Sequence, residues 1–327
     1  MKRTVFIVGA GASTDFGLPL GSKLAEQISD IVRDEINSRC QGPLFDSVLR
    51  SGIPGEWGEA ARDLSGGLVV ARSIDRFLDS RRSDRLVIEF GKRGIAEAIA
   101  RSERSSFIGN LPGEEWGQVH QALANSNGTW LAGLFGMLQE GCPPADCANV
   151  FGSCAFITFN YDRCIERYLQ FAFRHTLNQS SDAADAHVDA IPIVHVYGSL
   201  GSLPSQGDEG IPFGPSPNRV DDAAASIRTF TEGALDGTLE EAHRLIAEAE
   251  LLVFLGFGFD PLNVRALFPE RLSKGLPITG TSMGLSPSAL VAFRNVAFPD
   301  RSVQGMFADM DCKQFIRSEQ FRRRIDS

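Results

Sequence analysis

Short apolar runs, rich in β-branched and aromatic residues, recur along the chain, and segments with helical spacing lie between most of them. The runs cover residues 5–8, 155–159, 191–197, 251–255 and 277–281. Strands that are buried on both faces of a parallel sheet are apolar throughout, as residues 251–255 are. Strands that alternate with helices indicate parallel pairing. The pattern therefore predicts an α/β fold with a Rossmann-like, doubly wound parallel sheet.

A long segment between the first two expected strands has little strand signal. Apolar positions in residues 22–141 recur at helical spacing, and Leu24 and Ile28, for example, fall on one face. We expect this segment to form an inserted helical subdomain. Residues 1–21 and 142–327 are then expected to form the core that contains the sheet.

Composition and charge narrow the classes of protein that the sequence allows. The 327 residues are 43% hydrophobic and carry a formal net charge of −9, which argues against nucleic acid as the main ligand. The basic run at 322–324 is interpreted as a solvated helix end. No apolar run approaches the ~20 residues of a membrane span, and residues 1–3 lead directly into the first strand. We therefore expect a cytoplasmic protein that binds neither membranes nor nucleic acid directly.

The first expected strand is followed by a glycine turn at residues 9–13, with the sequence GAGAS. Glycine has no Cβ, so the main-chain N–H groups of such a turn can approach a pyrophosphate closely. A dinucleotide fingerprint would place a further glycine at position 14, but this residue is Thr14. Pro19, which cannot lie inside an ordinary helix, follows soon after Phe16. The turn is therefore not a standard Rossmann helix start. A tight turn that binds no ligand is the alternative.

Polar side chains follow the second expected strand. Asn160 and Asp162 come directly after the apolar run, and a helix is expected at residues 163–177. The carboxyl ends of the strands are where open α/β folds bind their ligands. We expect Asn160 and Asp162 to lie at a ligand site; the alternative is that they only cap the helix.

The third expected strand also ends in small and polar residues. His195 and Tyr197 share one face of the strand, and Gly198 and Ser199 follow. One of the two side chains on that face can point to a ligand, whereas a satisfied core histidine is the alternative for His195. The polar residues 180–187 before this strand are expected to form a loop.

A second Gly-x-Gly turn, Gly256-Phe257-Gly258, follows the fourth expected strand. Its main chain offers another platform for a ribose or a phosphate, and Asp260 or Asn263 could cap the next helix. Residues 279–284 form one more small-residue turn, at what we expect to be the adjacent strand end. A plain tight turn is again the alternative.

These four motifs, taken in order, resemble those of the sirtuin superfamily, and in particular its bacterial sirtuin-like branch associated with anti-phage defence. The matching segments are residues 9–13, 158–162, 197–199 and 256–258, and the helical insertion is similar to that of the same branch. The resemblance implies an NAD⁺ site. It places the first turn at the pyrophosphate, Asn160 at the nicotinamide ribose, Asp162 at the carboxamide, and the 256–258 turn on the adenosine side.

The residues expected to act on NAD⁺ form two sets. The catalytic set is Asn160, Asp162, Tyr197 and His195. The set expected to bind NAD⁺ is Gly9, Ala10, Gly11, Ala12, Ser13, Phe16, Gly198, Ser199, Gly256, Phe257 and Gly258.

Two departures from the family pattern argue against protein deacylation. The six cysteines include no spacing that could build the four-cysteine zinc module of deacylating sirtuins, so no zinc or other metal is expected. Tyr197 precedes Gly-Ser where the family has histidine, and His195 lies two residues earlier. Deacylation needs a base to activate a ribose hydroxyl, and tyrosine, with an ordinary pKa of ~10, is a poor base near neutrality. His195 could take that role if it points inward.

Hydrolysis of NAD⁺ makes fewer demands on these residues. The nicotinamide leaves as a neutral amine, so the barrier lies in stabilising an oxocarbenium-like centre and placing a water, which Asn160 could orient. We therefore expect an NAD⁺ glycohydrolase that releases nicotinamide and ADP-ribose. The alternatives are a non-catalytic sensor module for NAD⁺ or ADP-ribose, then a deacylase and, last, a dehydrogenase.

The resemblance also implies a biological setting. We expect a homo-oligomeric effector of anti-phage defence that depletes NAD⁺, in the manner of abortive infection. Its activity would be restrained until a separate sensor or ATPase protein joins it in a complex. The choice between NAD⁺ and NADP⁺ stays open.

Overall fold

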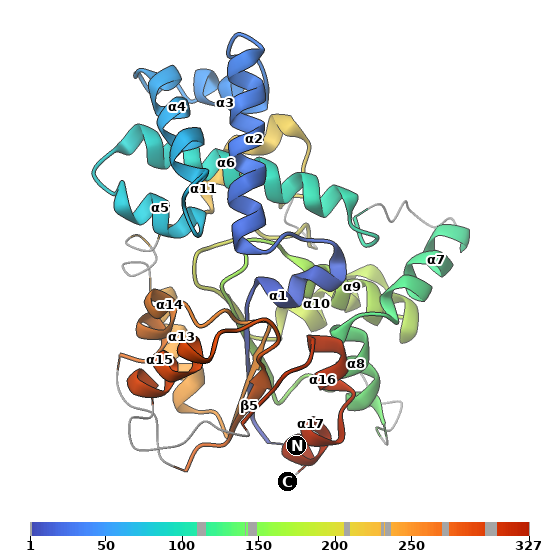
Figure 1. The fold of residues 1–327 in the computed structure, drawn as a ribbon. Coiled ribbons are helices and arrows are strands. Elements are labelled where there is room, and N and C mark those ends of the chain that lie inside the picture. The colour runs from blue at the N-terminus through green and yellow to red at the C-terminus, as the bar shows by residue number, and fades with distance from the viewer. Residues whose placement is uncertain are drawn as a thin grey trace.

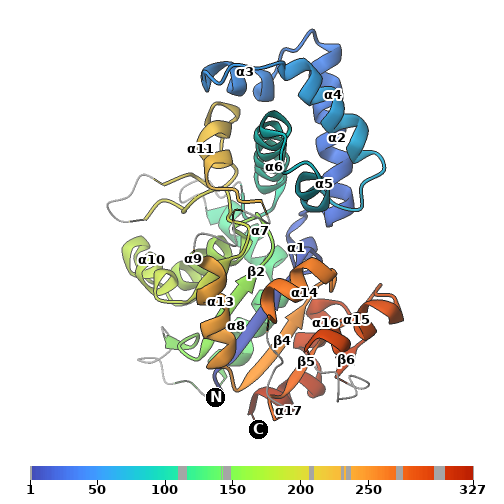
Figure 2. The same ribbon diagram turned by 90° about the vertical axis from the view of Figure 1, so that its left-hand side faces the viewer.

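The computed structural model contains a parallel sheet with helices on both faces and a group of helices at one end of it (Figures 1 and 2). The residues described are 2–109, 116–140, 142, 149–205, 210–229, 232, 237–269, 275–297 and 306–326.

Six strands form the sheet in the described part of the chain, and each pairs in parallel with its neighbours in the order β3-β2-β1-β4-β5-β6. Their bounds are β1 (Thr4–Val8), β2 (Cys154–Thr158), β3 (Ile193–His195), β4 (Leu251–Leu255), β5 (Ile278–Thr281) and β6 (Phe307–Ala308). Val8, at the end of β1, lies beside Thr158 and Leu255, so three strands end at one level. The predicted α/β, Rossmann-like parallel sheet is confirmed.

Two details of the sheet differ from the prediction. The third strand is shorter than residues 191–197, because the chain turns at its end, where Gly198 donates to the His195 carbonyl at 3.0 Å. The sixth strand, Phe307–Ala308, was not predicted from the sequence, and two residues are too few to give a recognisable apolar run.

Alternate side chains of the strands enter two different apolar clusters. Phe6 and Val253 pack with α8 (Trp130–Gln139), α9 (Cys164–Thr176), α10 (Ser181–Asp189), α16 (Cys312–Ile316) and α17 (Glu319–Asp326). Ile7 and Phe254 pack on the other face with α13 (Thr238–Ala247), α14 (Pro261–Leu267) and α15 (Pro287–Ala297). Both faces of the sheet are therefore covered, which explains why its strands are apolar throughout.

The expected loop at residues 180–187 is wrong, because this stretch belongs to α10. The Ser180 hydroxyl accepts from the Ala183 N–H and caps the helix, and Ala184 and Val188, four residues apart, are buried together. The polar composition hid a short amphipathic pattern of only two apolar positions.

The helices at the end of the sheet form what we call the helical group. It consists of α2 (Gly21–Asn37), α3 (Pro43–Arg50), α4 (Trp57–Leu68), α5 (Ile74–Ser80), α6 (Arg85–Ser105) and, from much later in the chain, α11 (Val220–Ala225). Both ribbon views place it beyond the carboxyl ends of the strands, opposite the chain termini (Figures 1 and 2).

The expected helical segment 22–141 therefore divides between two places. Helices α2 to α6 lie in the helical group, whereas α8 packs on the sheet through Trp130 and Leu134. Helix α7 (Trp116–Ser126) carries Val119 and Ala122, which pack with Phe171 of α9 in a small separate cluster.

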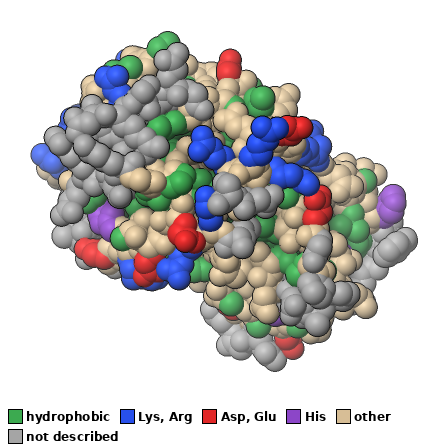
Figure 3. Space-filling view, turned by 90° about the horizontal axis from the view of Figure 1, so that it is seen from below, with side chains coloured by type: hydrophobic (Ala, Val, Ile, Leu, Met, Phe, Trp, Pro, Cys, Tyr) green, Lys and Arg blue, Asp and Glu red, His purple; other side chains and the backbone are tan. Residues whose placement is uncertain are grey.

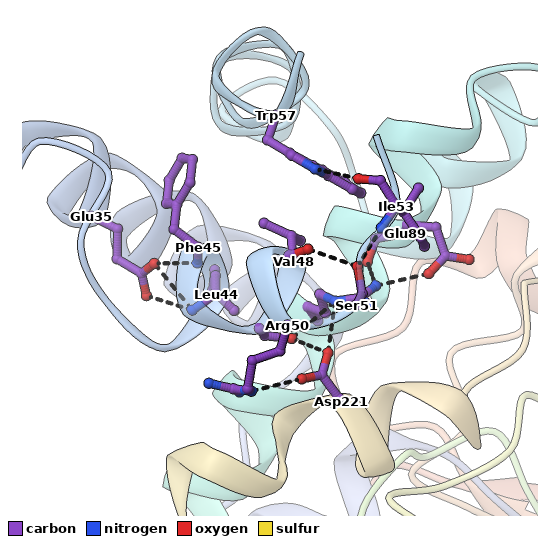
Figure 4. Close-up of polar contacts among 12 residues, drawn as sticks. Glu35, Leu44, Phe45, Val48, Arg50, Ser51, Ile53, Trp57, Glu89 and Asp221 are labelled. Atoms are coloured by element: carbon purple, nitrogen blue, oxygen red, sulfur yellow. Dashed lines mark hydrogen bonds and ion pairs between the residues drawn. The ribbon is translucent and has the colours of Figure 1, made fainter. Parts of the chain in front are cut away.

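Polar contacts attach α11 to the rest of the helical group (Figure 4). The Asp221 carboxylate accepts from the Ser47 hydroxyl, from Arg50 Nε at 3.2 Å and from Arg93 Nε at 3.3 Å. Nearby, Glu35 of α2 accepts from the Leu44 N–H at 3.1 Å, at the start of α3. The contacts of Asp221 join segments that are far apart in the sequence.

The surface at the opposite end carries charges of both signs (Figure 3). In the basic run of α17, Arg322 pairs with Glu140 at 2.8 Å and Arg323 with Glu319 at 2.7 Å. The positive charges of this run are thus largely matched by neighbouring carboxylates. Among the described residues, no helix is both long and apolar enough to cross a membrane.

A buried ion pair joins the helical group to the sheet core. Arg163, just before α9, and Glu103 of α6 are almost fully buried, with Nη2 and Oε2 2.7 Å apart. The remaining Arg163 donors reach main-chain carbonyls, including Pro212 at 2.9 Å, and Glu103 also accepts from the Gly214 N–H at 2.7 Å. The pair is therefore satisfied on all sides.

We expect Glu103→Ala to lower the free energy of unfolding by about 3–5 kcal/mol, because it leaves the Arg163 guanidinium buried without its counter-ion. Denaturant unfolding followed by circular dichroism measures this. The matched control is Glu319→Ala, which breaks a pair whose side chains are more than three-quarters exposed and should leave unfolding unchanged. Equal effects of the two variants would contradict the prediction.

Candidate functional site

A cavity of about 610 Å³ lies where the carboxyl ends of the strands meet the helical group. Its sheet side is formed by residues 9–11 after β1, 159–162 after β2, 256–258 and 260 after β4, and 281 and 283–285 at the end of β5. The start of α2 and residues of α5 and α6 line the other side. Open α/β folds bind ligands at this place, and cavities of roughly 300–1,000 Å³ hold ligands the size of a nucleotide.

The first glycine turn forms one side of the cavity. It opens helix α1 (Ala10–Ser13), which is a single turn and passes into a short 3-10 segment, Thr14–Phe16. Pro19 follows that segment, so the start differs from a long Rossmann helix, as its sequence indicates. Gly9, Ala10 and Gly11 line the cavity.

The two glycine turns touch each other, and this contact explains the glycines. A Cβ on Gly9 would lie 2.6 Å from the Gly256 carbonyl oxygen, and one on Gly11 would lie 2.8 Å from the Gly256 Cα. Gly256 has a φ of +57°, and its own Cβ would lie 2.2 Å from the Ala12 nitrogen. Close packing of main chain on main chain, besides any ligand, therefore requires glycine at these positions.

Asn160 connects the end of β2 to the first turn. Its Nδ2 donates to the Gly9 carbonyl at 3.1 Å and to Ser13 Oγ at 2.8 Å. Asp162, two residues later, also lines the cavity. Burial raises the pKa of Asp162, against the opposing effect of hydrogen bonds from the Ser13 hydroxyl and Cys164.

His195 lies behind Asn160 and is absent from the cavity lining. Its Nδ1 is 2.9 Å from the Asn160 carbonyl oxygen and its Nε2 is 2.7 Å from Glu166 Oε1. Both ring nitrogens are therefore engaged in holding the main chain of Asn160 and the Glu166 side chain. This geometry fits the expected alternative of a satisfied, buried histidine.

Tyr197 lines the cavity, but the two residues after it do not. Its hydroxyl donates to Asn263 Oδ1 at 2.5 Å, and burial raises the pKa of this phenol well above its ordinary value. Gly198 has a φ of +69°, and a Cβ there would lie 2.0 Å from the Ser226 carbonyl oxygen. Ser199 Oγ accepts from the Gly201 N–H at 3.3 Å. Gly198 and Ser199 thus determine the conformation of the loop after β3.

Of the expected site residues, nine line the cavity: Gly9, Ala10, Gly11, Asn160, Asp162, Tyr197, Gly256, Phe257 and Gly258. Six do not: Ala12, Ser13, Phe16, His195, Gly198 and Ser199. Phe16 is buried and stacks on Phe107 with 5.7 Å between ring centroids. Ser13 contributes indirectly, through its hydrogen bond with Asn160.

Helix α5 supplies cavity residues that the sequence reasoning missed. Asp75 accepts from the Tyr161 hydroxyl, and Arg76 Nε donates to Asp260 Oδ2 at 2.7 Å. Arg76 and Asp260 are 184 positions apart, and no local motif marks either Asp75 or Arg76. The sequence marked Asp260 and Asn263 only as candidate helix caps. Asp260 does cap α14, because its Oδ1 accepts from the Leu262 N–H.

One candidate nucleophile in the cavity lining is the thiol of Cys312. Cys312, at the start of α16, lines the cavity, but burial raises the pKa of its thiol to about 12. A thiol with that pKa is inert as a nucleophile near neutrality. In the described parts of the chain, no group of three or more His, Cys, Asp or Glu side chains could hold a metal ion.

The comparisons with known proteins assign no family. The sequence matches no family model, and no curated protein matches it significantly. The resemblance to sirtuin-like proteins therefore stays a prediction from the motifs.

The contact between the two turns generates a paired prediction. Gly256→Ala should lower the free energy of unfolding by about 2–4 kcal/mol, because its Cβ meets main-chain atoms and its φ is positive. Gly258→Ala is the matched control, since a Cβ there has no atom within 4 Å. Denaturant unfolding of both variants tests this, and a Gly256→Ala protein as stable as the control would contradict it.

The pair of Glu166 and His195 generates a prediction about pH. Burial opposes both charges, but each partner outweighs it for the other: the pKa of His195 is raised and that of Glu166 is lowered. The stabilisation linked to His195 is present below about pH 6.5 and is lost as pH rises through its raised pKa. The stabilisation linked to Glu166 is present above about pH 4.3 and is lost as pH falls through the lowered pKa of Glu166.

Glu166→Gln should therefore lower the midpoint of thermal unfolding more at about pH 5.5 than at about pH 9. Scanning calorimetry of wild type and variant at both values measures the difference. A control whose carboxylate pairs with an arginine, Arg244, is Glu241→Gln on α13, which should show no such extra loss at the lower pH. A larger loss for Glu166→Gln at the higher pH would contradict the sign.

Proposed function

We propose that this protein is an NAD⁺ glycohydrolase that releases nicotinamide and ADP-ribose. One observation carries the proposal: Gly9, Gly11, Asn160 and Asp162 line a single cavity at the carboxyl ends of β1 and β2. This is the combination of a glycine turn for a pyrophosphate with polar side chains for the nicotinamide ribose that the sequence resemblance implies.

The lining also suits the charge that develops during cleavage. As the bond from ribose to nicotinamide breaks, its electron pair leaves with the nicotinamide, and positive charge builds up at the anomeric carbon. The carboxylates of Asp162 and Asp75 lie in the lining of the same cavity. Fixed negative groups stabilise such a centre more strongly in a water-poor site than in bulk solvent.

Water completes the proposed reaction by forming a new bond from its oxygen to that carbon. Asn160 would orient the water, and its side chain is held in place by the Gly9 carbonyl and Ser13. Asp162 would accept the proton, because burial raises its pKa and makes its carboxylate a stronger base. His195, in contact with the Asn160 carbonyl, would act as a positioning residue outside the cavity.

A second candidate is a sensor module that binds NAD⁺ or ADP-ribose without cleaving it. The position of His195 behind the cavity favours it, because no histidine is among the described residues of the cavity lining. Deacylation has less support, since burial raises the pKa of Tyr197, so this phenol stays protonated near neutrality and cannot accept a proton. The role in anti-phage defence, the activating partner, the oligomer and the cytoplasmic location are proposals that rest on the sequence resemblance alone.

Asn160→Ala and Asp162→Asn should each lower the rate of nicotinamide release from NAD⁺ by about 100-fold or more, because each removes a group that acts on the reacting ribose. Chromatography of nicotinamide and ADP-ribose, without an acylated peptide, measures this. The control Asn218→Ala, in the 3-10 turn Pro217–Arg219 outside the cavity lining, should keep full activity.

The other outcomes separate the two candidates. Binding of NAD⁺ by calorimetry with no release from wild type, either alone or with candidate sensor or ATPase partners, would contradict the hydrolase and favour the sensor. Release that is unchanged in both variants would place the chemistry elsewhere. Failure to bind NAD⁺ would contradict both candidates.

A further inference from the structure

The described lining of the cavity carries more negative than positive side chains, and this opposes the binding of an anionic ligand. Its described lining residues include five carboxylates: Asp15, Asp75, Asp162, Asp260 and Asp311. Among the same described residues, Arg76 is the one arginine or lysine in the lining. A diphosphate carries two negative charges, so its binding in this cavity depends on the few groups that can offset repulsion.

The position and the chemistry of Arg76 both suit a contact with a phosphate group. It lies on α5 of the helical group, and its side chain reaches Asp260, two residues beyond the second glycine turn. The guanidinium has five N–H donors, and the contact with Asp260 uses Nε. Its planar donors match phosphate oxygens in a two-point geometry that a lysine could not reproduce.

The present partner of Arg76 can be exchanged. Side chains of Arg76 and Asp260 are about one-third exposed, at 36% and 33%, and ion pairs of this kind contribute little to stability. Asp260 also has a separate structural contact, because its Oδ1 caps α14 while its Oδ2 meets Arg76. Loss of the Arg76 contact therefore leaves the helix cap in place.

We propose that Arg76 is a ligand-binding residue that contacts the diphosphate of a dinucleotide in this cavity, leaving Asp260 when the ligand binds. This deepens the proposed function and rests on it. The helical group then supplies the sheet-based site with a cation that the glycine turns lack. Asp260 competes with the diphosphate for the same guanidinium.

That competition gives two variants opposite expected effects. Arg76→Gln removes the cation, so the affinity for ADP-ribose should fall about 10- to 100-fold, as expected for a lost charge-assisted hydrogen bond. Asp260→Asn keeps an N-cap but removes the competing charge, so the affinity should rise. If Arg76 only held α5 against the core, both variants would break the same contact and change the affinity in the same direction.

The experiment is titration calorimetry of wild type and variants with ADP-ribose, and with adenosine as a probe without phosphate. The matched control is Arg81→Gln, which removes a cation paired with Asp63 at 2.8 Å near the end of the same helix but outside the cavity lining. Arg76→Lys keeps the charge without the two-point geometry and should fall between wild type and Arg76→Gln. Thermal unfolding checks that each variant is folded.

The inference is supported if ADP-ribose binding falls in Arg76→Gln and rises in Asp260→Asn, while adenosine binding and the Arg81→Gln variant are unchanged. Equal loss in Arg76→Gln and Asp260→Asn, or equal loss in Arg81→Gln, overturns it. ADP-ribose binding that ignores Arg76 overturns this inference and leaves the hydrolase proposal standing. No binding of ADP-ribose by wild type would overturn both.

Discussion

The close approach of two main-chain turns at the end of the sheet is the constraint on which the site depends. Gly9 and Gly11 pack against Gly256, so the chain after β1 and the chain after β4 meet without side chains between them. The Gly256 N–H donates to Thr281 Oγ1 at 2.9 Å, which brings the end of β5 to the same point. Asn160 adds the end of β2 through the Gly9 carbonyl. Four strand ends are thus fixed together, and the cavity is the space above them.

Polar contacts of α5 join the helical group to the sheet at the cavity. Asp75 and Arg76 of α5 reach Tyr161 and Asp260 on the sheet side, through side chains in the cavity lining. By contrast, the attachment of α6 to α9 through Glu103 and Arg163 is deeply buried and fully hydrogen-bonded. The buried ion pair lies outside the cavity lining, whereas the partly exposed pair of Arg76 and Asp260 lies in it, an arrangement that suits a site which must admit a ligand.

Much of the fold could be predicted, because continuous apolar runs identify strands that are buried on both faces. Residues 251–255 are an example, and the sheet they indicate is present. The site was predictable only where it follows strand ends, as at Asn160 and the glycine turns. Alternation along a strand shows which residues share a face but not which side chain reaches the ligand, so the sequence could not decide between Tyr197, which lines the cavity, and His195, which does not. Asp75 and Arg76 enter through tertiary packing, for which the sequence carries no local signal.

The helical group is assembled from two parts of the chain, and this determines when it can form. Helices α2 to α6 precede β2, whereas α11 follows β3 and supplies the Asp221 carboxylate to Ser47, Arg50 and Arg93. During synthesis, the first five helices leave the ribosome well before their last partner does. They must wait, with the buried face of α6 uncovered, until two strands of the sheet and the segment up to residue 225 have also been made. Completion of the helices over the cavity therefore comes after β1, β2 and β3 have been made and before β4, β5 and β6 have been.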